Sequence, residues 1–186
     1  GRNLLAAETA AGVEHHLALS VVGTDRLGHS AYMQAKAAQE RLIKASKIPF
    51  TLLRATQFFE FIDAIIDSSV VDGTIRLSPA LIQAVAADDV AAVLADLAVG
   101  VAMNDVVEVA GPDRFPLAEL ARKFLAARND KRPVIADVHA RYFGSELDDR
   151  SLVAGEGSRI GPTRFHNWLI RCPAATPPAI FDGTLQ

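Results

Sequence analysis

The residues most suggestive of chemistry are Tyr32 and Lys36, which lie four positions apart. On a helix this spacing places both side chains on one face, one turn apart. A phenol ordinarily ionises near pH ~10, and a neighbouring ammonium group lowers that pKa because it favours the phenolate. The pair therefore predicts a tyrosine that can act as a general acid or base, for example by protonating a carbonyl oxygen as hydride reaches the carbon.

Ser20 lies late in an apolar segment, twelve positions before Tyr32. Ligands meet open α/β sheets at the ends of strands, so its hydroxyl could hydrogen-bond a substrate oxygen and position it. Each of these residues also has a simpler interpretation. Tyr and Lys are common on exposed helix faces, and a buried serine often bonds to the backbone. Their order along the chain, within a strand, a glycine-containing loop, a helix and a second strand, favours the chemical interpretation.

The elements that position these residues follow from apolar periodicity and from Gly and Pro. Helices are predicted over 2–11, 31–46, about 88–98, 117–127 and a last segment after Thr163, with strands over 15–22, 50–54, 73–77, 82–85 and 106–110. Ser30 is expected to cap the second helix, Asp88 or Asp89 the next, and Thr163 the last. The stretch 144–161 reads as a loop and the tail from Pro173 as irregular. Strands that alternate with helices favour an α/β fold with a parallel sheet.

Composition narrows the classes of partner. Half of the 186 residues are hydrophobic, and the net charge of −3 comes from acids and bases mixed along the chain. Nucleic acids and anionic membranes require a concentrated basic face, so neither is expected as a partner. No membrane span or signal peptide is recognisable. The single cysteine, Cys172, excludes an internal disulfide and favours a reducing, cytoplasmic setting.

Other polar and aromatic groups have plainer interpretations. His15 and His16 are adjacent, so in a strand they point to opposite faces, and no metal site is predicted. Arg54 is interpreted as the partner of a nearby acid. The cluster Phe58, Phe59 and Phe61 is read as core, with one ring available to a substrate pocket. Tyr142 and Phe143 are likewise read as ordinary packing, with a place in the pocket as the alternative.

Five segments follow one another in an order that resembles a known family: GRNLLAA (1–7), LSVVG (19–23), LRATQFFE (53–60), VAADDVA (85–91) and VEVAGP (107–112). With the Tyr32 to Lys36 helix, this order resembles the second half of the short-chain dehydrogenase/reductase fold. More narrowly, it resembles the atypical branch that groups NmrA-like proteins with related reductases and epimerase-like proteins. The resemblance implies a Rossmann-like parallel sheet with a small carboxy-terminal substrate-binding part.

The resemblance also implies domains and roles. Residues 1–115 would form part of an NAD(P)-binding domain, and 116–186 a small substrate-side region that interleaves with it. Tyr32 would be the catalytic acid or base, Lys36 would lower its pKa and hold the nicotinamide ribose, and Ser20 would orient a small carbonyl or alcohol substrate. Ala55, Thr56, Gln57 and Phe58 would contact the nicotinamide end of NAD or NADP.

One departure from the family pattern concerns the cofactor. Its glycine-rich turn, which brings backbone amides to the pyrophosphate, has no counterpart in this sequence. Because the chain also starts without Met inside a helical pattern, we expect an amino-terminally truncated piece that is inactive as it stands. Missing first strands would expose an edge of the sheet, which self-association could cover. The alternative function is an NmrA-like regulator that binds a dinucleotide without turnover.

Overall fold

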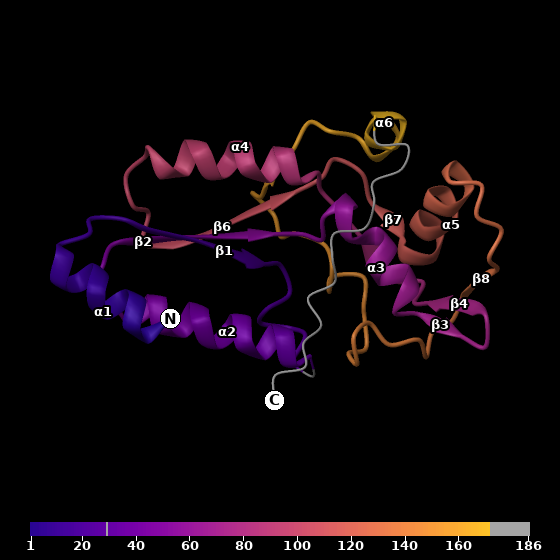
Figure 1. Ribbon diagram of the computed structural model, residues 1–186, viewed down its shortest axis with the longest axis horizontal. Coiled ribbons are helices and arrows are strands. Elements are labelled where there is room, and N and C mark those ends of the chain that lie inside the picture. The colour runs from indigo at the N-terminus through magenta and orange to yellow at the C-terminus, as the bar shows by residue number, and fades with distance from the viewer. Residues whose placement is uncertain (29, 172–186) are drawn as a thin grey trace.

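The computed structural model describes residues 1–28 and 30–171, and its centre is a parallel sheet with the strand order β1-β2-β6-β9. These strands are β1 (His16–Val21), β2 (Phe50–Ala55), β6 (Asp105–Ala110) and β9 (Arg159–Ile160). Helices α1 (Arg2–Ala11) and α2 (Ala31–Lys44) cover one face, and α4 (Ala87–Ala98) covers the other (Figure 1). The structure thus confirms the predicted α/β fold with a parallel sheet.

The remaining elements gather beyond one end of this sheet (Figure 1). They comprise the 3₁₀ helix Phe59–Phe61, α3 (Ile62–Asp67), β3 (Val70–Val71), β4 (Thr74–Leu77), β5 (Leu81–Ile82), β7 (Phe115–Pro116), α5 (Leu117–Ala127), β8 (Val134–Ala136) and α6 (Phe165–Arg171). Strand β4 pairs with β8, and β5 with β7, so segments before and after residue 115 share small sheets. The division of the chain near residue 115 remains a prediction.

Aromatic packing holds this second region together. The Phe59 ring lies 5.2 Å from that of Phe165 and 5.3 Å from that of Trp168, between ring centroids. Helix α5 adds its apolar face, on which Leu117, Leu120 and Phe124 recur at the helical period and are buried. Rings in tilted contact bury a large apolar area, so this cluster fixes α3, α5 and α6 against one another.

Apolar layers also fill both sides of the parallel sheet. Between the sheet and α4 lie Leu53, Val90 and Val109, and between the sheet and the first two helices lie Leu5 and Ile43. Side chains of a strand alternate between the two faces, so β2 places Leu52 on one side and Leu53 on the other. No helix within 1–28 and 30–171 is long and apolar enough to cross a membrane.

The predicted helices and long strands are present, and Ser30 is at the predicted N-cap of α2, but the other expected caps are wrong. Ser30 occupies the N-cap position of α2 without a side-chain hydrogen bond to the helix. Helix α4 begins after Ala86, so Asp88 and Asp89 lie in its first turn, where a carboxylate complements the helix dipole. The Asp89 carboxylate instead accepts hydrogen bonds from Thr163, which lies two residues before α6.

The short strands were harder to predict. Strand β5 covers only the start of the predicted segment 82–85, whose end, Val85, forms an isolated bridge to Phe58. Strands β3, β8 and β9 have two or three residues each and were not expected; β9 lies in the stretch read as loop. The tail predicted to be irregular, and Cys172, lie outside the described residues.

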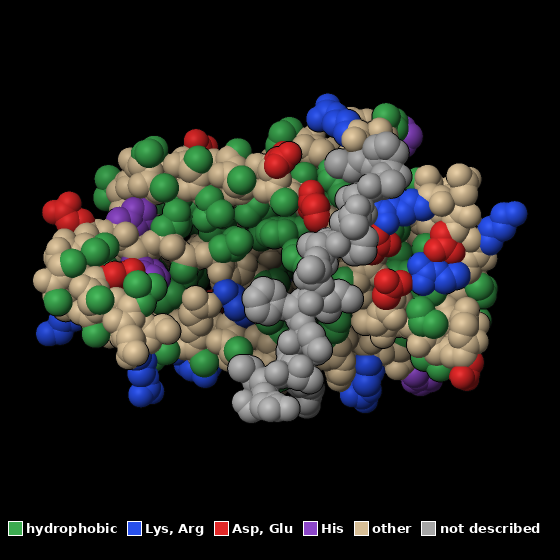
Figure 2. All heavy atoms as spheres, viewed as in Figure 1, with side chains coloured by type: hydrophobic (Ala, Val, Ile, Leu, Met, Phe, Trp, Pro, Cys, Tyr) green, Lys and Arg blue, Asp and Glu red, His purple; other side chains and the backbone are tan. Residues whose placement is uncertain are grey.

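Strand β1 forms one edge of the parallel sheet: within the described ranges it pairs with β2 alone. Its side chains are mostly half-buried. Figure 2 shows hydrophobic side chains gathered along this edge, between α4 and the layer of α1 and α2. An apolar edge strand with unpaired backbone groups is a surface that tends to acquire a partner strand.

A close backbone approach at Gly111 generates a testable prediction. A Cβ atom added to Gly111 would lie 1.9 Å from the carbonyl oxygen of Ala84, whereas one added to Gly28 would meet nothing within 4 Å. Gly111→Ala should therefore lower the free energy of unfolding by at least roughly 2 kcal/mol, because backbone must move. Gly28→Ala, the matched control, should change it by less than about 0.5 kcal/mol.

Chemical denaturation of both variants measures the difference. Equal stability of the two variants would contradict the close packing of residues 84 and 111.

Candidate active site

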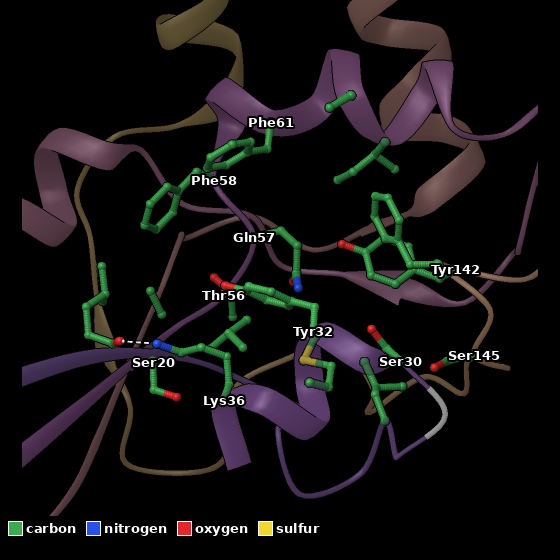
Figure 3. Close-up of a pocket in the computed structure, with 18 residues that line it drawn as sticks. Ser20, Ser30, Tyr32, Lys36, Thr56, Gln57, Phe58, Phe61, Tyr142 and Ser145 are labelled. Atoms are coloured by element: carbon green, nitrogen blue, oxygen red, sulfur yellow. Dashed lines mark hydrogen bonds between the residues drawn. The ribbon is translucent and has the colours of Figure 1, made fainter. Parts of the chain in front are cut away.

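A cavity of about 480 Å³ opens at the carboxyl ends of β1 and β2. The two strands are parallel, with Ser20 opposite Arg54 and Val21 opposite Ala55, so the segments that follow them start at the same edge of the sheet. Helix α2 returns along this edge and presents Tyr32 and Lys36 to the cavity (Figure 3). The order of elements read from the sequence thus converges on one place.

Every residue predicted for catalysis or cofactor binding lines this cavity: Ser20, Tyr32, Lys36, Ala55, Thr56, Gln57 and Phe58. Their roles remain predictions, but their proximity is established. Phe58 and Phe61 also line it, with ring centroids 5.8 Å apart in a stacked arrangement, while Phe59 lies in the core. The alternative in which part of the phenylalanine cluster reaches the pocket is therefore correct.

A loop that follows β8 supplies another part of the wall. Tyr142, Phe143 and Ser145 line the cavity, and Tyr142 and Ser145 lie on the side across from Lys36 (Figure 3). Ordinary packing was the favoured interpretation of Tyr142 and Phe143, but both residues line the cavity, as the alternative held. Ser145 was missed altogether. No sequence signal marks it, because more than a hundred residues separate it from Tyr32.

The ammonium group of Lys36 is held by the protein itself. Its Nζ atom donates to the carbonyl oxygen of Leu19 at 2.7 Å and to Oε1 of Gln39 at 2.7 Å. Burial lowers the pKa of Lys36, and the charge of Glu40 opposes that effect. These contacts place the cation at the end of β1, where it can act on a ligand in the cavity.

The phenol of Tyr32 differs from its prediction. Although Tyr32 is largely exposed, desolvation against the cavity wall raises its pKa above the ordinary value. The expected lowering of the Tyr32 pKa by Lys36 is not found, because desolvation sets the direction of the shift. In this arrangement Tyr32 is a protonated phenol at neutral pH, which is the form that donates a proton.

Behind the cavity, a buried cluster connects Ser20 to charged side chains. Ser20 Oγ donates to Glu40 Oε1 at 2.6 Å. Arg54 donates to both carboxylate oxygens of Glu40, at 2.9 and 2.7 Å, and to Asp25 at 3.2 Å. The ion pair interpreted for Arg54 is thus present. The Ser20 hydroxyl has one proton, which it donates to Glu40. Ser20 can therefore donate to a substrate oxygen only after that hydrogen bond breaks.

The charge state of Glu40 follows from these contacts. Burial alone would raise its pKa, but hydrogen bonds from Arg54 and Ser20 and the positive charges of Arg54 and Lys44 hold it below the ordinary value of 4.5. Arg54 in turn has its pKa raised, chiefly by the hydrogen bond to Glu40. Both groups are therefore ionised over the physiological range.

Several buried polar atoms of the cavity have no partner. Thr56 Oγ1, Gln57 Oε1 and Ser145 Oγ make no hydrogen bond, and all three residues line the cavity. Buried polar atoms are normally paired, so such a group of unpaired atoms around one cavity favours a ligand site. A metal ion is not favoured, because His, Cys, Asp and Glu side chains nowhere gather in threes within the described ranges.

Comparison with known proteins extends this geometry. No protein-family model matches the sequence, and no curated protein matches it. Solved structures do match. The NADPH-dependent quinone oxidoreductase QOR2 of Escherichia coli superposes with a TM-score of 0.61 and 22% identity, over 74% of this chain and 50% of that one. The chain has the Rossmann-like fold of these structures.

Two further matches have the same fold. The Citrobacter sp. triphenylmethane reductase complexed with NADP(H) has a TM-score of 0.52 and 20% identity, over 73% of this chain and 48% of its own. The Streptomyces venezuelae dTDP-glucose 4,6-dehydratase DesIV, with NAD bound, has a TM-score of 0.63 and 17% identity, over 92% and 62%. The chain therefore spans about half the length of the two reductases and somewhat more of the dehydratase.

The buried cluster around Glu40 generates a prediction for stability. Glu40→Gln removes the buried ionic partner of Arg54 and leaves only the more exposed Asp25, so the free energy of unfolding at pH 7 should fall by roughly 3–5 kcal/mol. Because the folded-state pKa of Glu40 lies below 4.5, its contribution is complete above that pH and is lost as pH falls through the folded-state pKa. The gap between wild type and variant should therefore narrow in acid.

Glu119→Gln is the matched control, because the Glu119 side chain is only half-buried and pairs with Lys123 at 3.3 Å on α5. It should cost less than about 0.5 kcal/mol. Denaturant titrations between pH 3 and 8 measure both variants. If Glu40→Gln costs no more than Glu119→Gln, the buried ion pair does not stabilise the fold.

Proposed function

We propose that this chain is part of an NAD(P)-dependent oxidoreductase of the atypical short-chain dehydrogenase/reductase type, which transfers hydride to or from a small carbonyl or alcohol. The observation that carries the proposal is the convergence of Tyr32, Lys36 and the segment Ala55–Phe58 on one cavity at the carboxyl edge of a parallel sheet. The nicotinamide cofactors named for the solved structures of the same fold give further support.

Tyr32 is the acid in this mechanism. When a carbonyl is reduced, its carbon gains hydride and its oxygen takes the proton from the phenolic oxygen of Tyr32, which solvent then restores. The raised pKa of Tyr32 suits this direction, because the phenol is protonated before the reaction. In the oxidative direction the phenol first loses its proton to solvent, and the same oxygen then takes the proton of the alcohol.

The residues present fit the nicotinamide end of the cofactor. Its carboxamide offers both a donor and an acceptor, which match the unpaired Thr56 Oγ1 and Gln57 Oε1. Lys36 can bind a ribose hydroxyl with the third proton of its ammonium group, since two are used by Leu19 and Gln39. Bound there, the cofactor would supply or accept the hydride.

Two parts of the proposal reach beyond these contacts. Ser20 would orient the substrate only after exchanging Glu40 for the substrate oxygen. Pyrophosphate binding requires backbone amides that no glycine-rich turn of this sequence supplies, so we propose that turnover needs residues outside this chain. Alone, the chain would hold the acid and the substrate cavity without a complete cofactor site.

The decisive experiment removes the phenolic oxygen. In the full-length protein, Tyr32→Phe should lower kcat/KM for a reducible carbonyl by about 100-fold or more, because the proton donor is lost. Cofactor affinity, measured by fluorescence titration of NADPH and NADH, should change little. Arg41→Gln, on the exposed side of the same helix, is the control and should keep wild-type turnover. Full activity of Tyr32→Phe would overturn the assignment.

A dinucleotide sensor without turnover is the second candidate. It is favoured by one observation: the protons of Ser20 and Lys36 are directed to Glu40, Leu19 and Gln39 instead of into the cavity. Binding of NADPH or NADH by the full-length protein, with no turnover across a broad panel of aldehydes, ketones and quinones, would favour the sensor over the enzyme.

The free edge of β1 leads to a proposal about assembly. We propose that the chain by itself covers this apolar edge by self-association. Static light scattering of the isolated chain should show a mass that rises with concentration above that of one 19.9 kDa chain. A constant monomeric mass over a hundredfold range of concentration would contradict it.

A further inference from the structure

The cavity has two chemically different parts. Most of its wall is apolar or aromatic, with Leu27, Met33 and Ile65 beside the stacked pair of Phe58 and Phe61. Lys36 is the one charged side chain among the lining residues that the structure describes, and no carboxylate joins them. A diphosphate, which carries more than one negative charge, would therefore meet a single cation that already donates two of its three protons to Leu19 and Gln39.

The polar part lies around Tyr142. In Figure 3 its hydroxyl points into the cavity toward the Gln57 side chain, and Ser145 lies nearby on the same loop. Gln57 is 8% and Ser145 1% exposed, yet Gln57 Oε1 and Ser145 Oγ have no hydrogen-bond partner. Burial raises the pKa of Tyr142 well above its ordinary value, opposed by a hydrogen bond with Gln57 and assisted by Tyr32. The Tyr142 hydroxyl therefore stays protonated and can donate a hydrogen bond.

We propose that Tyr142, Gln57 and Ser145 form a hydrogen-bonding end of the cavity that binds a neutral, flat and largely apolar carbonyl compound. The hydroxyls of Tyr142 and Ser145 each donate to a polar atom of the ligand or of a water bound with it, and the Gln57 side chain hydrogen-bonds Tyr142, which leaves its Oε1 for the cofactor. The aromatic walls contact the flat body of the ligand. This inference rests on the proposed function, because it names the substrate class of the same site.

Stability distinguishes a ligand-binding role from a structural one. A buried hydroxyl without a partner destabilises the empty protein, so Ser145→Ala should leave its thermal midpoint unchanged or higher. The same variant should weaken ligand binding, because the bond that the hydroxyl makes with the ligand is lost. A purely structural serine would behave in the opposite way, with lower stability and unchanged binding.

The test uses a matched pair of probes on the full-length protein without cofactor, titrated by NMR. Acetophenone should bind, and 4-acetylbenzoate, which adds only a carboxylate, should bind at least about tenfold more weakly, because its charge would be buried against a largely apolar wall whose one ammonium group already donates two of its three protons. UDP-glucose should not displace acetophenone. Tyr142→Phe and Ser145→Ala should each weaken acetophenone binding about fivefold, the effect of one hydrogen bond.

Ser158→Ala is the control for Ser145→Ala, because Ser158 lies on the same stretch of chain and does not line the cavity. Equal or tighter binding of 4-acetylbenzoate, displacement by UDP-glucose, or no binding of acetophenone would each overturn the proposal. Unchanged binding by both variants would also overturn it. These titrations need no turnover, so the inference can fail while Tyr32→Phe still supports the oxidoreductase, and the reverse can also occur.

Discussion

The carboxylate of Glu40 connects the parts of this protein that must stay in register. It lies on α2, two turns beyond Tyr32, and binds Arg54 on β2 and Ser20 on β1. A buried carboxylate is stable only when its oxygens are paired, so helix and sheet can pack here in essentially one relative position. The place of Tyr32 and Lys36 above the ends of both strands depends on that constraint.

The polar residues around the cavity fall into two groups, those bonded within the protein and those with an unpaired atom. Ser20 and Arg54 serve the buried cluster, and Lys36 binds the end of β1 through the Leu19 carbonyl. Three buried atoms have no protein partner, and their residues line the cavity: Thr56 Oγ1, Gln57 Oε1 and Ser145 Oγ. Paired groups therefore build the wall, and the unpaired groups are those available to a ligand.

The second region contributes to the site through its loop. Aromatic contacts among Phe59, Phe165 and Trp168 hold the elements beyond the sheet together. The loop that follows β8 closes one side of the cavity with Tyr142 and Ser145. In a Rossmann-like fold the sheet supplies the cofactor side of a site, so variation in such a loop can change which ligand binds while the sheet stays the same.

Local patterns determined much of this protein without a structure. The spacing of Tyr32 and Lys36, the apolar strands at 15–22 and 50–54, and the helix over 117–127 are short-range features, and the structure places them as expected. The parallel pairing of β1 and β2 brings Ser20, Lys36 and residues 55–58 to one edge of the sheet, and the family resemblance had already implied that they share a site.

Tertiary structure alone decided the properties that depend on distant neighbours. Asp89 binds Thr163 across 74 positions instead of capping its helix. Desolvation raises the pKa of the Tyr32 phenol. The ammonium group of Lys36 donates to Leu19 and Gln39. Tyr142 and Ser145 enter the cavity through a loop that no local signal connects to α2. Spacing fixes which side chains can share a face, but hydrogen-bond partners and burial are set by contacts that close only in the folded chain.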